Sequence, residues 1–176
     1  RREGGETLFV FGGDLCDPDT SRSYRAIGLA IDIALRLACN NVDSVWIAGN
    51  HDTIENDRGS TVLEPLAHVA LQMPTPSRTG RITVVEEPRW LMMGIGLRLV
   101  ALPHVARARH YDPAAYIRSV ESWIVGDVEV PETFLVVGHL TVPSAERGSE
   151  SGEFARGRDL VFPVEECRER WGDRAV

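Results

Sequence analysis

Three short apolar runs in this chain each end in glycine, and side chains able to bind a metal follow each one. They are residues 8–11 before Gly12-Gly13-Asp14, residues 45–48 before Gly49-Asn50-His51-Asp52, and residues 134–137 before Gly138-His139. Short apolar runs bounded by turn residues are typical of buried strands. Burying an amide, an imidazole or a carboxylate without a partner costs about 2–7 kcal/mol each, so such groups at strand ends indicate a functional site. We therefore expect strands that deliver polar side chains to one edge of a sheet.

The segment between the first two runs predicts a helix over residues 23–39, with N-caps at residues 19–21. Apolar side chains recur there at helical spacing: Ile27, Ala30, Ile31, Ala34, Leu35 and Ala38. A helix that connects two strands predicts a parallel pair whose polar ends share one edge.

Two further helices are expected later in the chain. One covers residues 61–73, shortened or interrupted at Pro65, and the other covers residues 114–125, after an N-cap at Asp112 and a proline at position 113.

Short strands and a long loop account for the rest of the chain. Residues 81–85, 90–93 and 97–102 are apolar stretches separated by turn residues, and we expect neighbouring antiparallel strands. Residues 141–158 are polar and rich in glycine, which predicts an exposed loop with a functional role.

Composition predicts one soluble globular domain over residues 1–176. Hydrophobic residues make up 43% of the chain, and no apolar run approaches the roughly 18 residues that cross a bilayer. A net charge of −7 argues against a protein held to nucleic acid by a broadly basic surface. It does not argue against a metal-centred phosphoesterase, because bound cations supply positive charge. Cys16, Cys39 and Cys167 are far apart and form no C-x-x-C motif, which favours a reducing cytoplasm over disulfides or a thiolate zinc site.

The three motifs resemble, in order and in position after apolar strands, those of the calcineurin-like metallophosphoesterases. The matching residues are Gly13-Asp14 with Asp17, then Gly49-Asn50-His51-Asp52, then Gly138-His139. The resemblance covers almost the whole chain. It implies a four-layer αββα sandwich of two mixed sheets flanked by helices, with a two-metal centre at the strand ends.

The resemblance also implies a role for each polar residue. Asp14 corresponds to the carboxylate that bridges the two ions, and Asn50 and His139 correspond to ligands of the second ion. His51 corresponds to the histidine above the metals that assists the leaving group, and Asp52 would orient His51.

A narrower resemblance is to the SbcD-type nucleases. It rests on residues 138–142, on residues 159–163 after a loop rich in Ser, Glu, Arg and Gly, and on Leu102-Pro103 at the end of a strand. Those nucleases pair with an SMC-like ATPase in double-strand-break repair, so the resemblance implies a DNA substrate, such a partner, and a homodimer formed through the helix at residues 23–39. Ile27, Ile31 and Leu35 of that helix would serve equally well as core.

Two motifs of the family do not occur in this sequence. They are the opening Asp-x-His, which precedes the position of Asp14, and the closing Gly-His-x-His, expected soon after Val176. We expect the sequence to be truncated at both ends and its metal centre to be incomplete.

Oxygen and imidazole ligands without thiolates suit Mn²⁺ and, less selectively, Mg²⁺, Fe or Zn²⁺. Two such ions about 3.5–4 Å apart clamp a phosphate and generate hydroxide near neutral pH. Three hypotheses follow: a metal-dependent DNA exo- or endonuclease subunit, a general phosphodiesterase or phosphatase acting on small molecules, and a catalytically incompetent binding module.

Each site residue also has a simpler interpretation. Residues 49–52 could form an Asx-rich turn with Asn50 in a left-handed conformation, and His139 could be a hydrogen-bonded polar residue at a strand end. His104 and His110 flank two arginines, Arg107 and Arg109, and we interpret them as solvated loop residues rather than phosphate contacts.

Overall fold

The computed structural model describes residues 7–16, 24–54, 60–73, 80–93, 97–105, 110–122, 134–140 and 160–171. Within them the elements run in the order β1 (Leu8–Phe11), α1 (Tyr24–Cys39), β2 (Asp43–Ile47), α2 (Glu64–Gln72), β3 (Ile82–Val85), β4 (Arg89–Met92), β5 (Arg98–Leu102), α3 (Pro113–Ser122), β6 (Phe134–Gly138) and α5 (Val164–Trp171).

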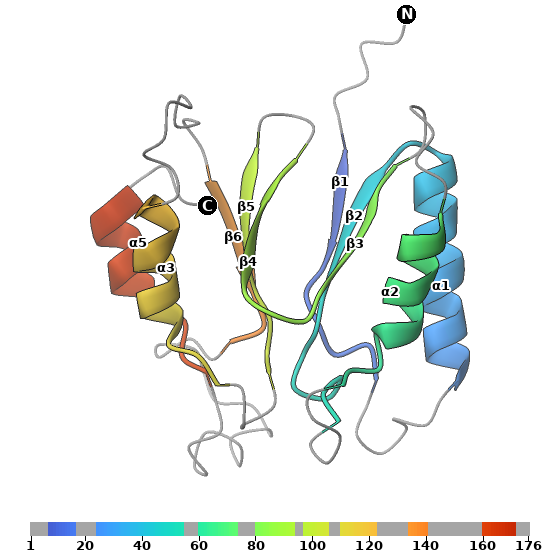
Figure 1. Ribbon diagram of the computed structural model, residues 1–176, viewed down its shortest axis with the longest axis horizontal. Coiled ribbons are helices and arrows are strands. Elements are labelled where there is room, and N and C mark those ends of the chain that lie inside the picture. The colour runs from blue at the N-terminus through green and yellow to red at the C-terminus, as the bar shows by residue number, and fades with distance from the viewer. Residues whose placement is uncertain are drawn as a thin grey trace, which may run out of the picture.

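These elements form four layers. One sheet has the strand order β1-β2-β3 and the other β4-β5-β6. The two sheets face each other, with α1 and α2 on the outer side of the first and α3 and α5 on the outer side of the second (Figure 1). The predicted four-layer αββα sandwich is confirmed, although among the described strands only the second sheet is mixed and the first is all parallel.

Side chains that alternate along each strand fill the spaces between the layers. Val45 and Ile47 of β2 pack between the two sheets with Leu99 of β5, whereas Trp46 packs on the other side of β2 with Ala34 of α1. Successive side chains of a strand face opposite sides of the sheet, so a strand covered on both faces is apolar throughout. The space beneath α3 and α5 is filled by Val100, Leu102, Ile117 and Cys167.

The strand pairings confirm part of the predicted topology and correct another part. β1 and β2 are parallel, as expected for strands joined by a helix. The antiparallel pairing expected for residues 81–85 is wrong, because β3 is parallel to β2, with Val84 opposite Trp46. The helix α2 joins β2 to β3 just as α1 joins β1 to β2, and such a crossover returns the chain in the same direction. β4 and β5 are antiparallel as expected, and β6 runs parallel to β5.

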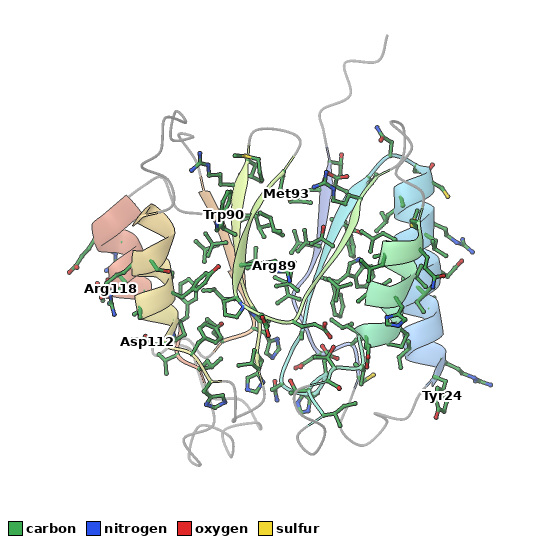
Figure 2. All side chains as sticks on the ribbon, viewed as in Figure 1. Tyr24, Arg89, Trp90, Met93, Asp112 and Arg118 are labelled. Carbon is green, nitrogen blue, oxygen red and sulfur yellow. The ribbon has the colours of Figure 1, made fainter. Side chains whose placement is uncertain are left out.

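The first two helices begin near their predicted positions. α1 starts at Tyr24, which projects from the end of the helix (Figure 2). It buries Ala30, Ala34 and Ala38, so it packs closely on the sheet, and Ile31 and Leu35 pack against the same core. α2 starts at Glu64 rather than residue 61, because the Thr61 hydroxyl accepts a hydrogen bond from the Leu63 amide at 3.1 Å just before the first turn. Proline 65 lies in that first turn and does not interrupt the helix.

Charged side chains cap the helix α3 and pair it with α5. The predicted N-cap of α3 is confirmed, since the Asp112 carboxylate accepts a hydrogen bond from the Ala114 amide at 2.9 Å. Arg118 of α3, labelled with Asp112 in Figure 2, lies 2.6 Å from a Glu166 carboxylate oxygen of α5. We made no prediction of α5 from the sequence.

Some predicted features lie outside the described residues. They are Asp17, the N-caps at residues 19–21, Arg107, Arg109, the end of the third helix at residues 123–125, and the loop at residues 141–158. In the part of the chain that the structure describes, no helix is long and apolar enough to span a membrane. Cys16, Cys39 and Cys167 are free thiols.

Candidate metal centre

The carboxyl ends of strands from both sheets meet at one edge of the sandwich. The turns after β1 and β2 lie side by side because these strands are parallel. One backbone hydrogen bond joins the two sheets at this edge, from the His104 amide to the Ala48 carbonyl oxygen at 2.9 Å, and within the second sheet the His139 amide donates to the Leu102 carbonyl oxygen at 3.1 Å. The end of β6 is thereby fixed beside the end of β2.

Three predicted metal ligands converge at this edge. His139 Nε2 lies 2.8 Å from Asn50 Oδ1 and 3.3 Å from Asp14 Oδ2. Ligand atoms that share one ion at about 2.1 Å lie about 3–3.4 Å from one another, depending on the angle between the bonds. The 3.3 Å separation falls within that range, and the 2.8 Å separation is shorter, at hydrogen-bond distance. The side chains of His139 and Asp14 are 26% and 27% exposed, so both are partly accessible to solvent.

The hydrogen bond at Nδ1 of the His139 ring determines whether Nε2 presents a hydrogen or a lone pair to Asp14 and Asn50. Nδ1 lies 3.0 Å from the Gly12 carbonyl oxygen, and a carbonyl can only accept, so Nδ1 carries a hydrogen. A neutral ring then has a lone pair at Nε2, which faces the Asp14 carboxylate and the Asn50 amide oxygen. Three acceptors that face one another need a cation or a proton between them. This donor set therefore fits a divalent metal ion, with the Gly12 carbonyl fixing the tautomer of the ligand.

Asp14 is held by an unusual backbone conformation and by both of its carboxylate oxygens. Its φ is 59°, in the left-handed region, and that of Gly13 is 107°. Oδ1 accepts a hydrogen bond from the His51 amide at 3.1 Å, which leaves Oδ2 directed at His139. Asn50 is not among the described residues with positive φ, so the simpler interpretation of its turn as left-handed at Asn50 is not what the structure has.

The two glycine turns are in direct backbone contact. A Cβ added at Gly13 would lie 2.6 Å from His139 Nδ1 and 2.8 Å from the Gly49 Cα, and one added at Gly49 would overlap the Asp14 backbone and carboxylate. Glycine is therefore required at both positions by the lack of space.

Asp52 links the same two turns through its carboxylate. Its side chain is fully buried, Oδ1 accepts a hydrogen bond from the Cys16 amide at 3.2 Å, and Oδ2 accepts one from the Gly49 amide at 2.9 Å. Burial, and to a lesser degree the Asp52 charge, raise the pKa of the Cys16 thiol. Asp52 thus fixes backbone atoms on both sides of the centre, and its expected role in orienting His51 stays a prediction.

One of two neighbouring histidines was predicted wrongly from the sequence. His104 directly follows the buried Pro103 at the end of β5 and is half-buried, so its interpretation as a solvated loop residue is wrong, whereas His110 is exposed as expected. The two rings meet edge to face, with their centroids 6.2 Å apart. An apolar run followed by an imidazole is the same signal as at His139, but proline stands in place of glycine.

The comparisons with known proteins identify no family for this chain. No protein-family model matches the chain, and no curated protein matches it. Among the described residues, no group of three or more His, Cys, Asp and Glu side chains is placed to hold a metal, because the centre combines two such residues with Asn50.

Replacing Gly49 by alanine tests the contact between the turns. We expect Gly49→Ala to lower the free energy of unfolding by at least about 2 kcal/mol, because the new Cβ must displace the Asp14 backbone. Urea unfolding measures the effect. The matched control is Gly12→Ala, where a Cβ meets nothing within 4 Å, and a change of no more than about 1 kcal/mol is expected. Equal stability of the two variants would contradict the contact.

Replacing Asp52 by asparagine tests the link beneath the turns. We expect a loss of about 2–4 kcal/mol in unfolding free energy, because the amide loses the charge and turns an NH₂ group toward one of the two backbone amides. The control is Asp43→Asn, whose carboxylate accepts one hydrogen bond from the Arg81 amide in an exposed position, and which should lose less than about 1.5 kcal/mol. Similar losses in both variants would show that the buried Asp52 hydrogen bonds contribute no more to the unfolding free energy than the exposed Asp43 hydrogen bond.

Proposed function

We propose that this chain is a metal-dependent phosphodiester hydrolase of the metallophosphoesterase type, acting on DNA as the SbcD-type nucleases do. The observation that carries the proposal is the approach of His139 Nε2 to Asn50 Oδ1 and Asp14 Oδ2, from three segments of two different sheets. Hydrogen-bonded polar clusters also occur at inactive strand ends. What favours a metal is that the groups facing one another are acceptors, with the tautomer of His139 set by the Gly12 carbonyl.

Asp14, Asn50 and His139 would hold the metal. The chemistry of these ligands favours Mn²⁺. Bound divalent ions would polarise the phosphate and generate a hydroxide nucleophile. The protein positions these side chains. Asp52 and the contact between Gly13 and Gly49 hold together the turns that carry Asp14 and Asn50, and the Leu102 carbonyl oxygen fixes the backbone of His139.

His51 is the residue that we assign to the leaving group. Its amide donates to Asp14, so its position is tied to a metal ligand, and its side chain is half-buried at the same edge. A histidine that donates a proton to a leaving oxygen typically contributes about 10²–10⁴ in rate.

The charge of the chain is consistent with this proposal. A net charge of −7 repels a polyanionic substrate, so attraction to phosphate has to come from local cations rather than from the surface as a whole. An SMC-like ATPase partner, a homodimer and a cytoplasmic location belong to the same proposal. Leu29 and Ile33 of α1 are exposed, which supports a helix face available for a homodimer, whereas Ile31 and Leu35 pack inward.

The complete protein should cleave DNA when Mn²⁺ is present and lose this activity when the metal is chelated. We expect Asp14→Ala to abolish both Mn²⁺ binding and cleavage, and His51→Ala to lower kcat about 10²–10⁴-fold while Mn²⁺ still binds. Cleavage of a labelled duplex and of single-stranded DNA measures activity, and calorimetry measures metal binding. Asp32→Ala, which removes an exposed carboxylate paired with Arg36 on α1, is the control and should behave as wild type.

Other outcomes would contradict parts of the proposal. Full activity in Asp14→Ala would remove its role as a ligand. Turnover of chromogenic phosphodiesters without DNA cleavage would favour the small-molecule hydrolase. An inability of the complete protein to bind Mn²⁺ would favour the binding module.

A further inference from the structure

His104 is fixed between the segments that carry two of the metal ligands. Its amide donates to the carbonyl oxygen of Ala48, directly before the Gly49 turn, and two residues earlier the Leu102 carbonyl accepts a hydrogen bond from the His139 amide. The side chain of His104 therefore starts from the same edge of the sandwich as Asn50 and His139. No motif of the resemblance assigns it a role.

A second set of contacts holds His104 and His110 in place. The Tyr111 hydroxyl donates to the Pro103 carbonyl oxygen at 2.9 Å, which ties the residue before His104 to the residue after His110. Burial, followed by the neighbouring Tyr116, raises the pKa of Tyr111, so its hydroxyl remains a donor at neutral pH. The Tyr111 ring also meets the Tyr116 ring of α3 edge to face, with centroids 6.4 Å apart. Both imidazoles thus sit on backbone that is anchored to the core.

The two rings form an edge-to-face pair in which one imidazole is half-buried and the other is exposed. His104 is half-buried beside the strand ends, His110 is exposed, and the ring centroids are 6.2 Å apart at an interplanar angle of 81°. A neutral imidazole has one N–H donor and one acceptor, and it can donate to a phosphate oxygen without a full charge. In a chain with net charge −7, donors beside the centre would hold a polyanionic substrate that the surface as a whole repels.

We propose that His104 and His110 bind the phosphodiester beyond the phosphate held by Asp14, Asn50 and His139, and so favour substrates with more than one phosphate. This inference rests on the proposed function for the identity of the substrate. The two histidines are positioning residues in this account: they contact the neighbouring phosphate and leave the chemical step to the centre.

Ring-preserving substitutions test the pair. His104→Phe and His110→Phe keep an aromatic ring but remove the N–H donors, whereas His104→Gln restores a donor. The matched control is His68→Phe, an exposed histidine on α2 in the outer helical layer. The main-chain bond from residue 104 to Ala48 survives all these changes. Kinetics with Mn²⁺ would compare trithymidylate, which has two internucleotide phosphates, with bis(p-nitrophenyl) phosphate, which has one phosphate.

We expect each Phe variant to raise KM for trithymidylate about 3- to 10-fold, as the loss of a hydrogen bond predicts, with kcat unchanged. KM for bis(p-nitrophenyl) phosphate should not change, His104→Gln should recover part of the loss, and His68→Phe should match wild type. An unchanged KM for trithymidylate in both Phe variants would overturn the inference. An equal loss with both substrates would also overturn it, because the histidines would then act on the metal-held phosphate or on the fold.

A binding measurement separates this inference from the proposed function. Fluorescence anisotropy with a fluorescein-labelled phosphorothioate trithymidylate does not depend on turnover. Weaker binding by the Phe variants, about 3- to 10-fold in Kd, supports the pair even if the protein hydrolyses neither substrate, in which case only the proposed function fails. Equal Kd values for wild type and both Phe variants overturn the pair even if the protein is an active nuclease.

Discussion

The backbone contact between the turns after β1 and β2 is the constraint on which the site depends. A side chain at Gly13 or Gly49 would occupy space already filled by the other turn or by its ligands, and the buried Asp52 carboxylate accepts a hydrogen bond from each side. Parallel pairing brings the two strand ends to one edge, and this contact places Asp14 directly against the Gly49 turn. The approach of the ligands is therefore a property of the backbone as much as of the side chains.

The second sheet completes the arrangement by supplying an imidazole. His139 is fixed through its own amide to Leu102 and through its ring to the Gly12 carbonyl, so its Nε2 lone pair is directed at two further acceptors. Acceptors that face one another need a proton or a cation between them, and a divalent ion fits this donor set. His104 is bonded through its amide to Ala48 beside the Gly49 turn, and its ring meets that of His110. The groups that we propose to bind phosphate thus lie at one edge of the sandwich of an acidic chain.

The sequence allowed much of this arrangement to be predicted, because strand ends marked by glycine and a polar residue are local signals. The parallel pairing of β1 with β2, the cap of α3 at Asp112, and the four layers implied by the resemblance are confirmed. The pairing of β3 was predicted wrongly, because a short apolar run does not indicate its neighbour and α2 was not recognised as a crossover. The bond from the Cys16 amide to Asp52 and the bond from the His104 amide to Ala48 join residues far apart in sequence, which no local pattern reveals.

The position of Mn²⁺ in crystals of the complete protein, located by anomalous scattering, tests the central claim most directly. The account predicts manganese bonded to the Asp14 carboxylate, Asn50 Oδ1 and His139 Nε2 at about 2.0–2.3 Å, with the ring still bound to the Gly12 carbonyl through Nδ1. Manganese bound elsewhere, with these three side chains contacting only one another, would contradict it.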